Sequence, residues 1–169
     1  MSKVTANILR FIVVLLAQIF VFGLIHLFGC VNAYVYLLAL LLLPLELPRW
    51  VQYLIAFATG FIVDMFAMSY GVHAFSCVLM MFVRPYLVNA LNGRPNDGSI
   101  EKLTPGDKDF SWILLYTVIL VFIHQLSAIM LEAFTFRHFG RTLLVILGNT
   151  AFTTILILCF EYLFTPVKK

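Results

Sequence analysis

The amino-acid sequence predicts an all-α protein, a bundle of six transmembrane helices that forms one integral membrane domain over residues 1–169. The first reason is composition: 63% of the residues are hydrophobic and only 11% are charged, whereas a soluble domain carries about 25% charged residues. The second reason is arrangement, because the apolar residues gather in runs of about 20, the length that a helix needs to cross a bilayer core of roughly 30 Å. Most of the protein surface must therefore face lipid.

The predicted spans, in chain order, are residues 8–28, 31–47, 50–68, 71–91, 110–131 and 143–164. The first span follows Lys3 and Arg10 but has no small-residue cleavage site after it, so we expect an uncleaved helix rather than a signal peptide. The second span ends at Pro44 and Pro48, and proline removes a helical hydrogen bond and kinks or stops a helix. If this run only dips into the membrane, five spans remain and the C-terminus lies on the opposite side.

The remaining spans have clearer boundaries. Span 50–68 opens at Trp50, a residue typical of the membrane–water interface, and the turn MSYG separates it from span 71–91. A polar loop over residues 92–109, with glycine, proline and charges of both signs, separates the first four spans from the last two. We expect this loop to be a cytoplasmic linker.

The lysine and arginine residues predict the orientation, because loops on the cytoplasmic side are enriched in them. With the N-terminus inside, nine of the 11 lie on the cytoplasmic side, and only Arg137 and Arg141 lie outside. Both termini are therefore predicted to be cytoplasmic. This topology explains the net charge of +3, so the charge gives no reason to expect a nucleic-acid partner.

Five polar side chains fall within the spans or at their ends, toward the non-cytoplasmic side: His26, Asp64, His73, His124 and Gln125. A carboxylate is costly in hydrocarbon, and intramembrane charges usually face protein and have a partner. Asp64 and His73 flank a short turn between two antiparallel spans, so we expect a hydrogen bond or an ion pair between them. The set is either a structural network that fixes helix packing, which is the interpretation we favour, or a ligand or proton-linked site.

Small residues mark the face of the third span that packs against protein. Ala56, Gly60 and Asp64 recur at every fourth position and so share one face of a helix. Small residues let membrane helices approach closely, and Gly71 opens the next span after the turn. Asp64 is therefore predicted to point into the protein and away from lipid.

A second group of polar residues is predicted at the cytoplasmic interface. Glu46 and Arg49 can pair in the connection between the second and third spans. Near the inner end of the fourth span, Arg84 can extend its guanidinium group to the lipid headgroups, and Pro85 can bend the helix. These residues either anchor the chain at the membrane surface or form a docking surface for a partner.

The sequence carries no recognisable catalytic or metal-binding motif. Cys30, Cys77 and Cys159 have no C-x-x-C spacing, and the histidines are single residues on different spans rather than an H-E-x-x-H pair. No G-x-S-x-G element accompanies the serines. We therefore expect a protein that is not an enzyme and that uses neither a cofactor nor a metal.

The chain resembles the family of the bacterial rod shape-determining protein MreD, best over residues 31–90. The resemblance rests on four short elements that follow one another along the chain. They are Pro48-Arg49-Trp50, the G-x-x-x-D element from Gly60 to Asp64, the turn glycine Gly71, and Arg84-Pro85. An apolar chain of similar length and a polar loop before the last two spans fit the same family.

MreD proteins are non-catalytic subunits of the cell-elongation machinery in the bacterial cytoplasmic membrane. The resemblance thus implies a scaffold that regulates cell shape and peptidoglycan synthesis by binding MreC, alongside MreB, RodA and the transpeptidase partner of RodA. It also implies a fold similar to the substrate-binding subunits of energy-coupling-factor vitamin transporters, which have six helices and a pocket in the outer half. The alternative function is therefore that of such a subunit, which captures a small metabolite. No catalytic residue of the family carries over to this chain.

Overall fold

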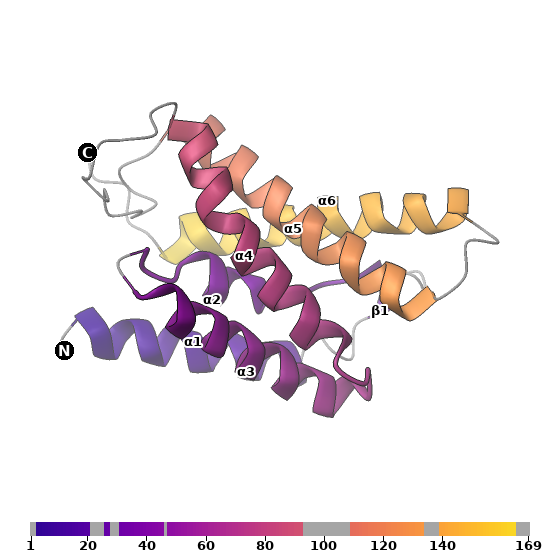
Figure 1. Ribbon diagram of the computed structural model, residues 1–169, viewed down its shortest axis with the longest axis horizontal. Coiled ribbons are helices and arrows are strands. Elements are labelled where there is room, and N and C mark those ends of the chain that lie inside the picture. Colours follow the sequence, from indigo (N-terminus) through magenta and orange to yellow (C-terminus); the bar gives the residue numbers. More distant parts are fainter. Residues whose placement is uncertain are drawn as a thin grey trace.

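The computed structural model describes residues 3–20, 26–27, 31–45, 47–92, 109–133 and 139–164. Within them the helices are α1 (Lys3–Phe20), α2 (Leu37–Leu41), α3 (Arg49–Ala67), α4 (Val72–Asn92), α5 (Phe110–Ala133) and α6 (Phe139–Phe164). Two short strands, β1 (His26–Leu27) and β2 (Val31–Asn32), pair antiparallel with His26 opposite Asn32. The helices form a bundle in which α1 and α6 run close to the long axis of the molecule, while α4 and α5 cross it obliquely (Figure 1).

Four helices are long and apolar enough to cross a membrane: Arg49–Ala67, Val72–Asn92, Phe110–Glu132 and Gly140–Glu161. They coincide with the predicted spans 50–68, 71–91, 110–131 and 143–164. The expectation of a helical membrane protein is confirmed for these four helices by length and composition.

The first predicted span, 8–28, extends beyond the helix that the structure describes there. Helix α1 begins at Lys3 and ends at Phe20, and its apolar stretch Phe11–Phe20 contains one polar residue, Gln18. His26 and Leu27, which were expected to be helical, lie in β1 instead. Pairing with β2 satisfies backbone groups there without a helix, which apolar composition alone does not predict.

The second predicted span, 31–47, is not a continuous helix. Only Leu37–Leu41 are helical, and a helix of five residues rises only about 7.5 Å, far short of a bilayer core. Pro44 lies beyond the end of α2, and Pro48 occupies the N-cap position of α3. The run is apolar for a different reason: Ala33 to Leu41 are all buried, with exposed fractions between 0 and 8%. We call these residues the central segment.

Side chains from the surrounding helices satisfy the non-helical backbone of the central segment. The Gln18 amide of α1 donates to the Ala33 carbonyl at 2.9 Å and accepts from the Tyr36 N–H at 3.3 Å. On the other side, Thr153 of α6 accepts from the Tyr34 N–H at 3.4 Å. Irregular backbone at membrane depth is tolerated where protein surrounds it and fills its hydrogen bonds, and these contacts do so here.

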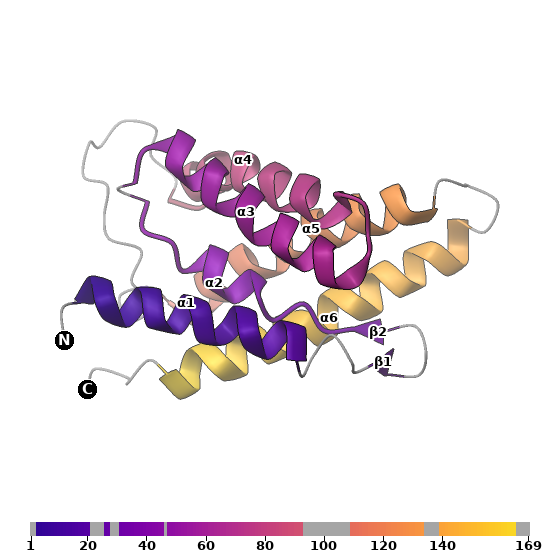
Figure 2. The same ribbon diagram turned by 90° about the horizontal axis from the view of Figure 1, so that it is seen from below.

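The helices pack in chain order around the central segment. Helix α3 packs against α4, α4 against α5, and α5 against α6, while α1 contacts α2. Figure 2 shows α2 between α1 and α3, with the β1–β2 pair at the far end of the bundle. In both views the start of α1, the start of α3 and the end of α6 lie at the opposite end from that pair.

Candidate functional site

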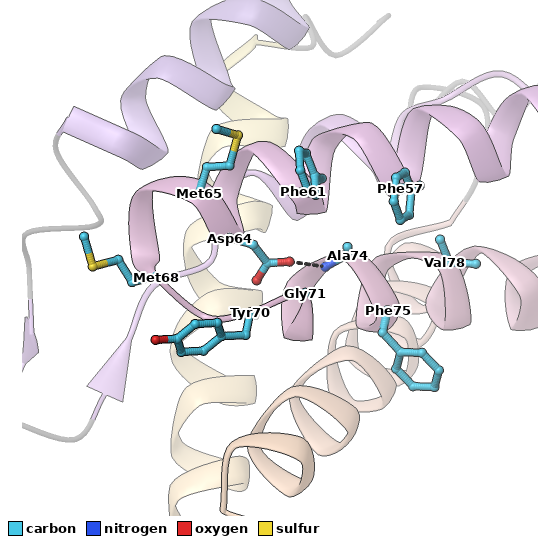
Figure 3. Close-up of a pocket in the computed structure, with 10 residues that line it drawn as sticks. All are labelled: Phe57, Phe61, Asp64, Met65, Met68, Tyr70, Gly71, Ala74, Phe75 and Val78. Carbon is cyan, nitrogen blue, oxygen red and sulfur yellow. Dashed lines mark hydrogen bonds between the residues drawn. The ribbon is translucent and has the colours of Figure 1, made fainter.

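Asp64, the carboxylate inside α3, lies against the N-terminus of α4. Its Oδ1 accepts from the His73 backbone N–H at 3.0 Å and from the Ser69 hydroxyl at 2.5 Å, and its Oδ2 accepts from the Ala74 N–H at 2.8 Å. Figure 3 shows the last of these bonds. The first N–H groups of a helix have no partner within the helix, and the N-terminal end of the helix dipole attracts negative charge. Helix α4 therefore stabilises the charge that the membrane disfavours.

Gly60 brings the two helices close enough for this contact. A Cβ atom on Gly60 would lie 2.5 Å from the Ala74 Cα atom and 2.6 Å from the His73 carbonyl oxygen. No side chain fits in this space, so the α3 and α4 backbones touch one turn before Asp64. Ala56, one turn further back, is fully buried. The Ala56–Gly60–Asp64 face is thus the face that α3 turns toward the protein.

The turn between α3 and α4 uses backbone conformations that few residues adopt. Met68, Tyr70 and Gly71 all have positive φ angles, of 54°, 50° and 90° respectively. Glycine adopts such a conformation without steric cost, which gives the predicted turn glycine its physical role. The Ser69 N–H and the Met68 N–H both donate to the Asp64 carbonyl, so Asp64 closes α3 as well as capping α4.

His73 joins Asp64 through its backbone, and its imidazole turns to a different partner. The Tyr36 hydroxyl lies 3.4 Å from His73 Nδ1 and 2.8 Å from His124 Nε2. The Cys77 thiol donates to the same hydroxyl at 3.6 Å. The expected contact between the Asp64 and His73 side chains is therefore wrong. Asp64 binds the backbone N–H of His73, and the His73 imidazole contacts the Tyr36 hydroxyl of the central segment instead.

This Tyr36-centred cluster connects three elements of the bundle. Tyr36, Cys77 and His124 are fully buried and His73 is 3% exposed. The two imidazole rings stack with centroids 5.9 Å apart and planes 12° apart. Two predicted histidines, far apart in the sequence, are thus brought together by a tyrosine that sequence reasoning missed. Phenolic hydroxyls are easily overlooked because tyrosine is counted among the hydrophobic residues.

The other members of the predicted polar network have different surroundings. Gln125 is fully buried next to His124, and neither atom of its amide has a hydrogen-bonding partner among the described residues. His26 lies in β1, but its side chain lies outside the described part of the chain. Sequence reasoning also missed the buried face of α6, which holds Asn149, Thr150, Thr153 and Thr154. Their spacing of three and four residues was the available signal.

For Arg84, the expectation that the guanidinium group extends to the lipid headgroups is wrong. Its side chain is fully buried. Its Nε donates to the Tyr116 hydroxyl at 2.7 Å, its Nη1 to Gln52 Oε1 at 3.3 Å, and its Nη2 to the carbonyls of Leu41, at 3.0 Å, and Leu43. The last carbonyls of a helix lack partners and carry negative partial charge. Arg84 therefore caps the C-terminus of α2, which ends at Leu41 and not at residue 47 as the predicted span does.

The rest of the predicted cytoplasmic interface is only partly described. Arg49 begins α3 and is exposed, and Pro85 lies half-buried within α4. Glu46 lies outside the described residues, so its expected pairing with Arg49 is not described either. Gln52, which had no assigned role, accepts from Arg84 and donates to the Leu47 carbonyl at 2.8 Å. It links Arg84 to the connection before α3.

A groove of about 740 Å³ runs along the outer face of the α3–α4 hairpin. Its lining residues come from both helices and the turn: Phe57, Phe61, Asp64, Met65, Met68, Tyr70, Gly71, Ala74, Phe75 and Val78. Figure 3 shows Asp64 and Ala74 between the α3 side chains Phe57, Phe61 and Met65 and the α4 side chain Phe75. We call this the α3–α4 groove. Its rim is apolar, and Asp64 is 5% exposed at its floor.

The described residues contain no group of three or more histidine, cysteine or acidic side chains that would hold a metal ion. Comparisons of the chain with models of protein families, with curated proteins and with solved structures find no match.

Proposed function

We propose that this chain is a non-catalytic membrane scaffold that binds a transmembrane helix of a partner protein in the α3–α4 groove. By its resemblance to MreD proteins, the partner is MreC, and the complex is the cell-elongation machinery of the bacterial cytoplasmic membrane. One observation carries the proposal: Gly60, Asp64 and Gly71, three of the positions on which the resemblance rests, build the hairpin that forms this groove.

The groove has the features that a partner helix requires. In lipid there is no hydrophobic force between helices, so association depends on close packing of side chains. Phe57 and Phe61 are about half exposed and stack with ring centroids 5.9 Å apart, forming an ordered ridge on α3. Phe75 lines α4 beyond the small floor residues Gly71 and Ala74. A helix that places its own side chains between these two rows would fill the groove.

The capping contacts of Asp64 support a structural role for this residue. Both of its oxygens accept hydrogen bonds from α4 or from the turn, so the carboxylate fixes the angle between the helices that form the groove. A scaffold needs a surface that is already shaped before the partner arrives, because ordering it on binding reduces the affinity.

The proposed topology places both termini in the cytoplasm with six crossings, the second of them made by the run 31–47 that contains the central segment. The distribution of lysine and arginine supports this orientation. The start of α1 and the end of α6 lie at the same end of the bundle, as an even number of crossings requires.

Site-specific photocrosslinking in the native host tests the proposed contact. A photoreactive phenylalanine analogue placed at Phe61 or Phe75 is expected to crosslink to MreC. The matched control is Ile155 on α6, which is 60% exposed and lies outside the groove. Equal crosslinking from all three positions, or none from the groove positions, would contradict the proposal.

A second candidate function is that of a transporter subunit that binds a small metabolite. The observation that favours it is the polar interior, where Tyr36, His73 and His124 meet inside the bundle. The two functions are distinguished with purified protein in lipid nanodiscs and a panel of vitamins. A specific increase in thermal stability with one vitamin supports the transporter subunit, and no increase with any of them favours the scaffold.

A further inference from the structure

The three glutamines of this chain are all buried, but they differ in their hydrogen bonds. Both amide atoms of Gln18 bind the central segment, and both amide atoms of Gln52 bind Leu47 and Arg84. The amide of Gln125 has no hydrogen-bonding partner for its nitrogen or its oxygen among the described residues, although the residue is fully buried. The same holds for His124 Nδ1 and for the hydroxyls of Thr150 and Thr154.

One of these side chains, that of His124, lies beside Tyr34 of the central segment. The Tyr34 ring centroid is 5.8 Å from that of His124 on α5, and the Tyr34 N–H donates to Thr153 on α6. Thr150 lies about one helical turn before Thr153, Thr154 follows it directly, and all three are buried. Tyr34 therefore contacts both α5, through His124, and α6, through Thr153. We call His124, Gln125, Thr150 and Thr154 the α5–α6 polar layer.

Such a set of groups is unfavourable unless something else completes its hydrogen bonds. A primary amide offers two donor hydrogens and an acceptor oxygen, and a buried group that leaves them unused loses the hydrogen bonds that water gave it. Native proteins rarely leave buried polar atoms without partners. Buried water molecules make about three hydrogen bonds each, typically to groups that lack protein partners.

We infer that the α5–α6 polar layer binds ordered water molecules inside the membrane-embedded bundle. All of its groups are hydroxyl, amide or imidazole groups, which both donate and accept hydrogen bonds, as water does. The layer itself contains no carboxylate that would favour a cation instead. The water molecules complete the hydrogen bonds of Gln125 and His124 on α5 and of Thr150 and Thr154 on α6. This inference is independent of the proposed scaffold function.

Radiolytic hydroxyl-radical labelling in ¹⁸O-water tests the inference with the full chain in lipid nanodiscs. Radicals formed from a bound water molecule label the side chains beside it, even when these are buried. We expect ¹⁸O incorporation at His124 to exceed that at Met81 several-fold. Met81 is the reference because it is 1% exposed, lies in the apolar core and is intrinsically more reactive. Labelling of His124 at or below the level of Met81 overturns the inference.

A pair of variants shows whether the water belongs to this layer. Gln125→Met keeps the length of the side chain but removes the amide, so labelling of His124 is expected to fall several-fold. Thr59→Val is the control, because the Thr59 hydroxyl bonds only within α3, to the Ile55 carbonyl, and labelling should stay at the wild-type level. Unchanged labelling of His124 in Gln125→Met overturns the assignment to this layer. The wild-type measurement decides the question alone if the variant does not fold.

Discussion

The Asp64 carboxylate accepts a hydrogen bond from the backbone N–H of Ala74 at 2.8 Å. This contact brings the charge inside α3 against the positive end of the α4 dipole, where two further donors also reach it. A carboxylate in a membrane helix thus serves as the N-terminal cap of the neighbouring helix. The consequences for stability can be measured residue by residue.

Substitution of Asp64 should show which property of the carboxylate matters. Asp64→Leu removes every acceptor and leaves the first N–H groups of α4 unpaired, so we expect a loss of about 2–3 kcal/mol in the free energy of unfolding. Asp64→Asn keeps one oxygen acceptor and should lose about half as much. Chemical unfolding in detergent micelles measures both. Equal losses in the two variants would show that the negative charge, rather than hydrogen bonding, is the stabilising property.

Gly60 should tolerate no larger side chain. In Gly60→Ala the new Cβ would lie 2.5 Å from the Ala74 Cα, so the helices must separate, and we expect a loss of about 1–3 kcal/mol. The control is Gly140→Ala on α6, where a Cβ meets no atom within 4 Å. That substitution should be neutral or stabilising by up to about 1 kcal/mol, since alanine favours helix. The thermal unfolding midpoints of the two variants are compared. Equal shifts would contradict the close approach of α3 and α4.

Arg84 should not be replaceable by lysine. A lysine keeps the positive charge but lacks the planar fork that reaches Tyr116, Gln52 and the end of α2 together, so Arg84→Lys should lose about 2–4 kcal/mol. The control, Arg49→Lys, changes an exposed residue at the start of α3 and should stay within about 0.5 kcal/mol of wild type. Denaturant titration of both variants is the measurement. If Arg84→Lys leaves the free energy of unfolding unchanged, the positive charge alone, and not the geometry of the guanidinium group, stabilises the protein at this position.

Removal of the Tyr36 hydroxyl should loosen the interior cluster. Tyr36→Phe removes the hydroxyl that contacts His73, Cys77 and His124. The buried imidazoles then lose a hydrogen-bonding partner, so we expect the free energy of unfolding to fall by about 1–2 kcal/mol. Tyr70→Phe is the matched control, because Tyr70 is fully exposed. The comparison uses thermal unfolding in nanodiscs. If both variants unfold at the wild-type temperature, the cluster does not contribute to stability.

The long helices could be predicted from the sequence, but the central segment could not. A run of apolar residues has the same composition whether lipid or protein surrounds it. The sequence therefore predicts a span over residues 31–47, although Ala33 to Leu41 are buried by protein. Proline at positions 44 and 48 was the one local sign that the helix would be interrupted.

For the same reason, the burial of Arg84 could not be predicted from the sequence. Its position near the end of a span is typical of a cytoplasmic anchor. The carbonyls of Leu41 and Leu43 that it binds become available only because α2 ends there. A partner of this kind depends on the tertiary fold and leaves no spacing pattern in the sequence. By contrast, the small-residue spacing of Ala56, Gly60 and Asp64 is local, and it placed these residues on the buried face of α3.

Depletion of this protein in its native host tests the proposed function most directly. The chain would be placed under a repressible promoter, and the cells would be examined by microscopy with and without added vitamins. If the chain is an elongation scaffold, depleted cells will lose their rod shape and become round, and no metabolite will restore the shape. Cells that keep a normal shape and recover growth with a single nutrient would contradict the scaffold and support a transporter subunit.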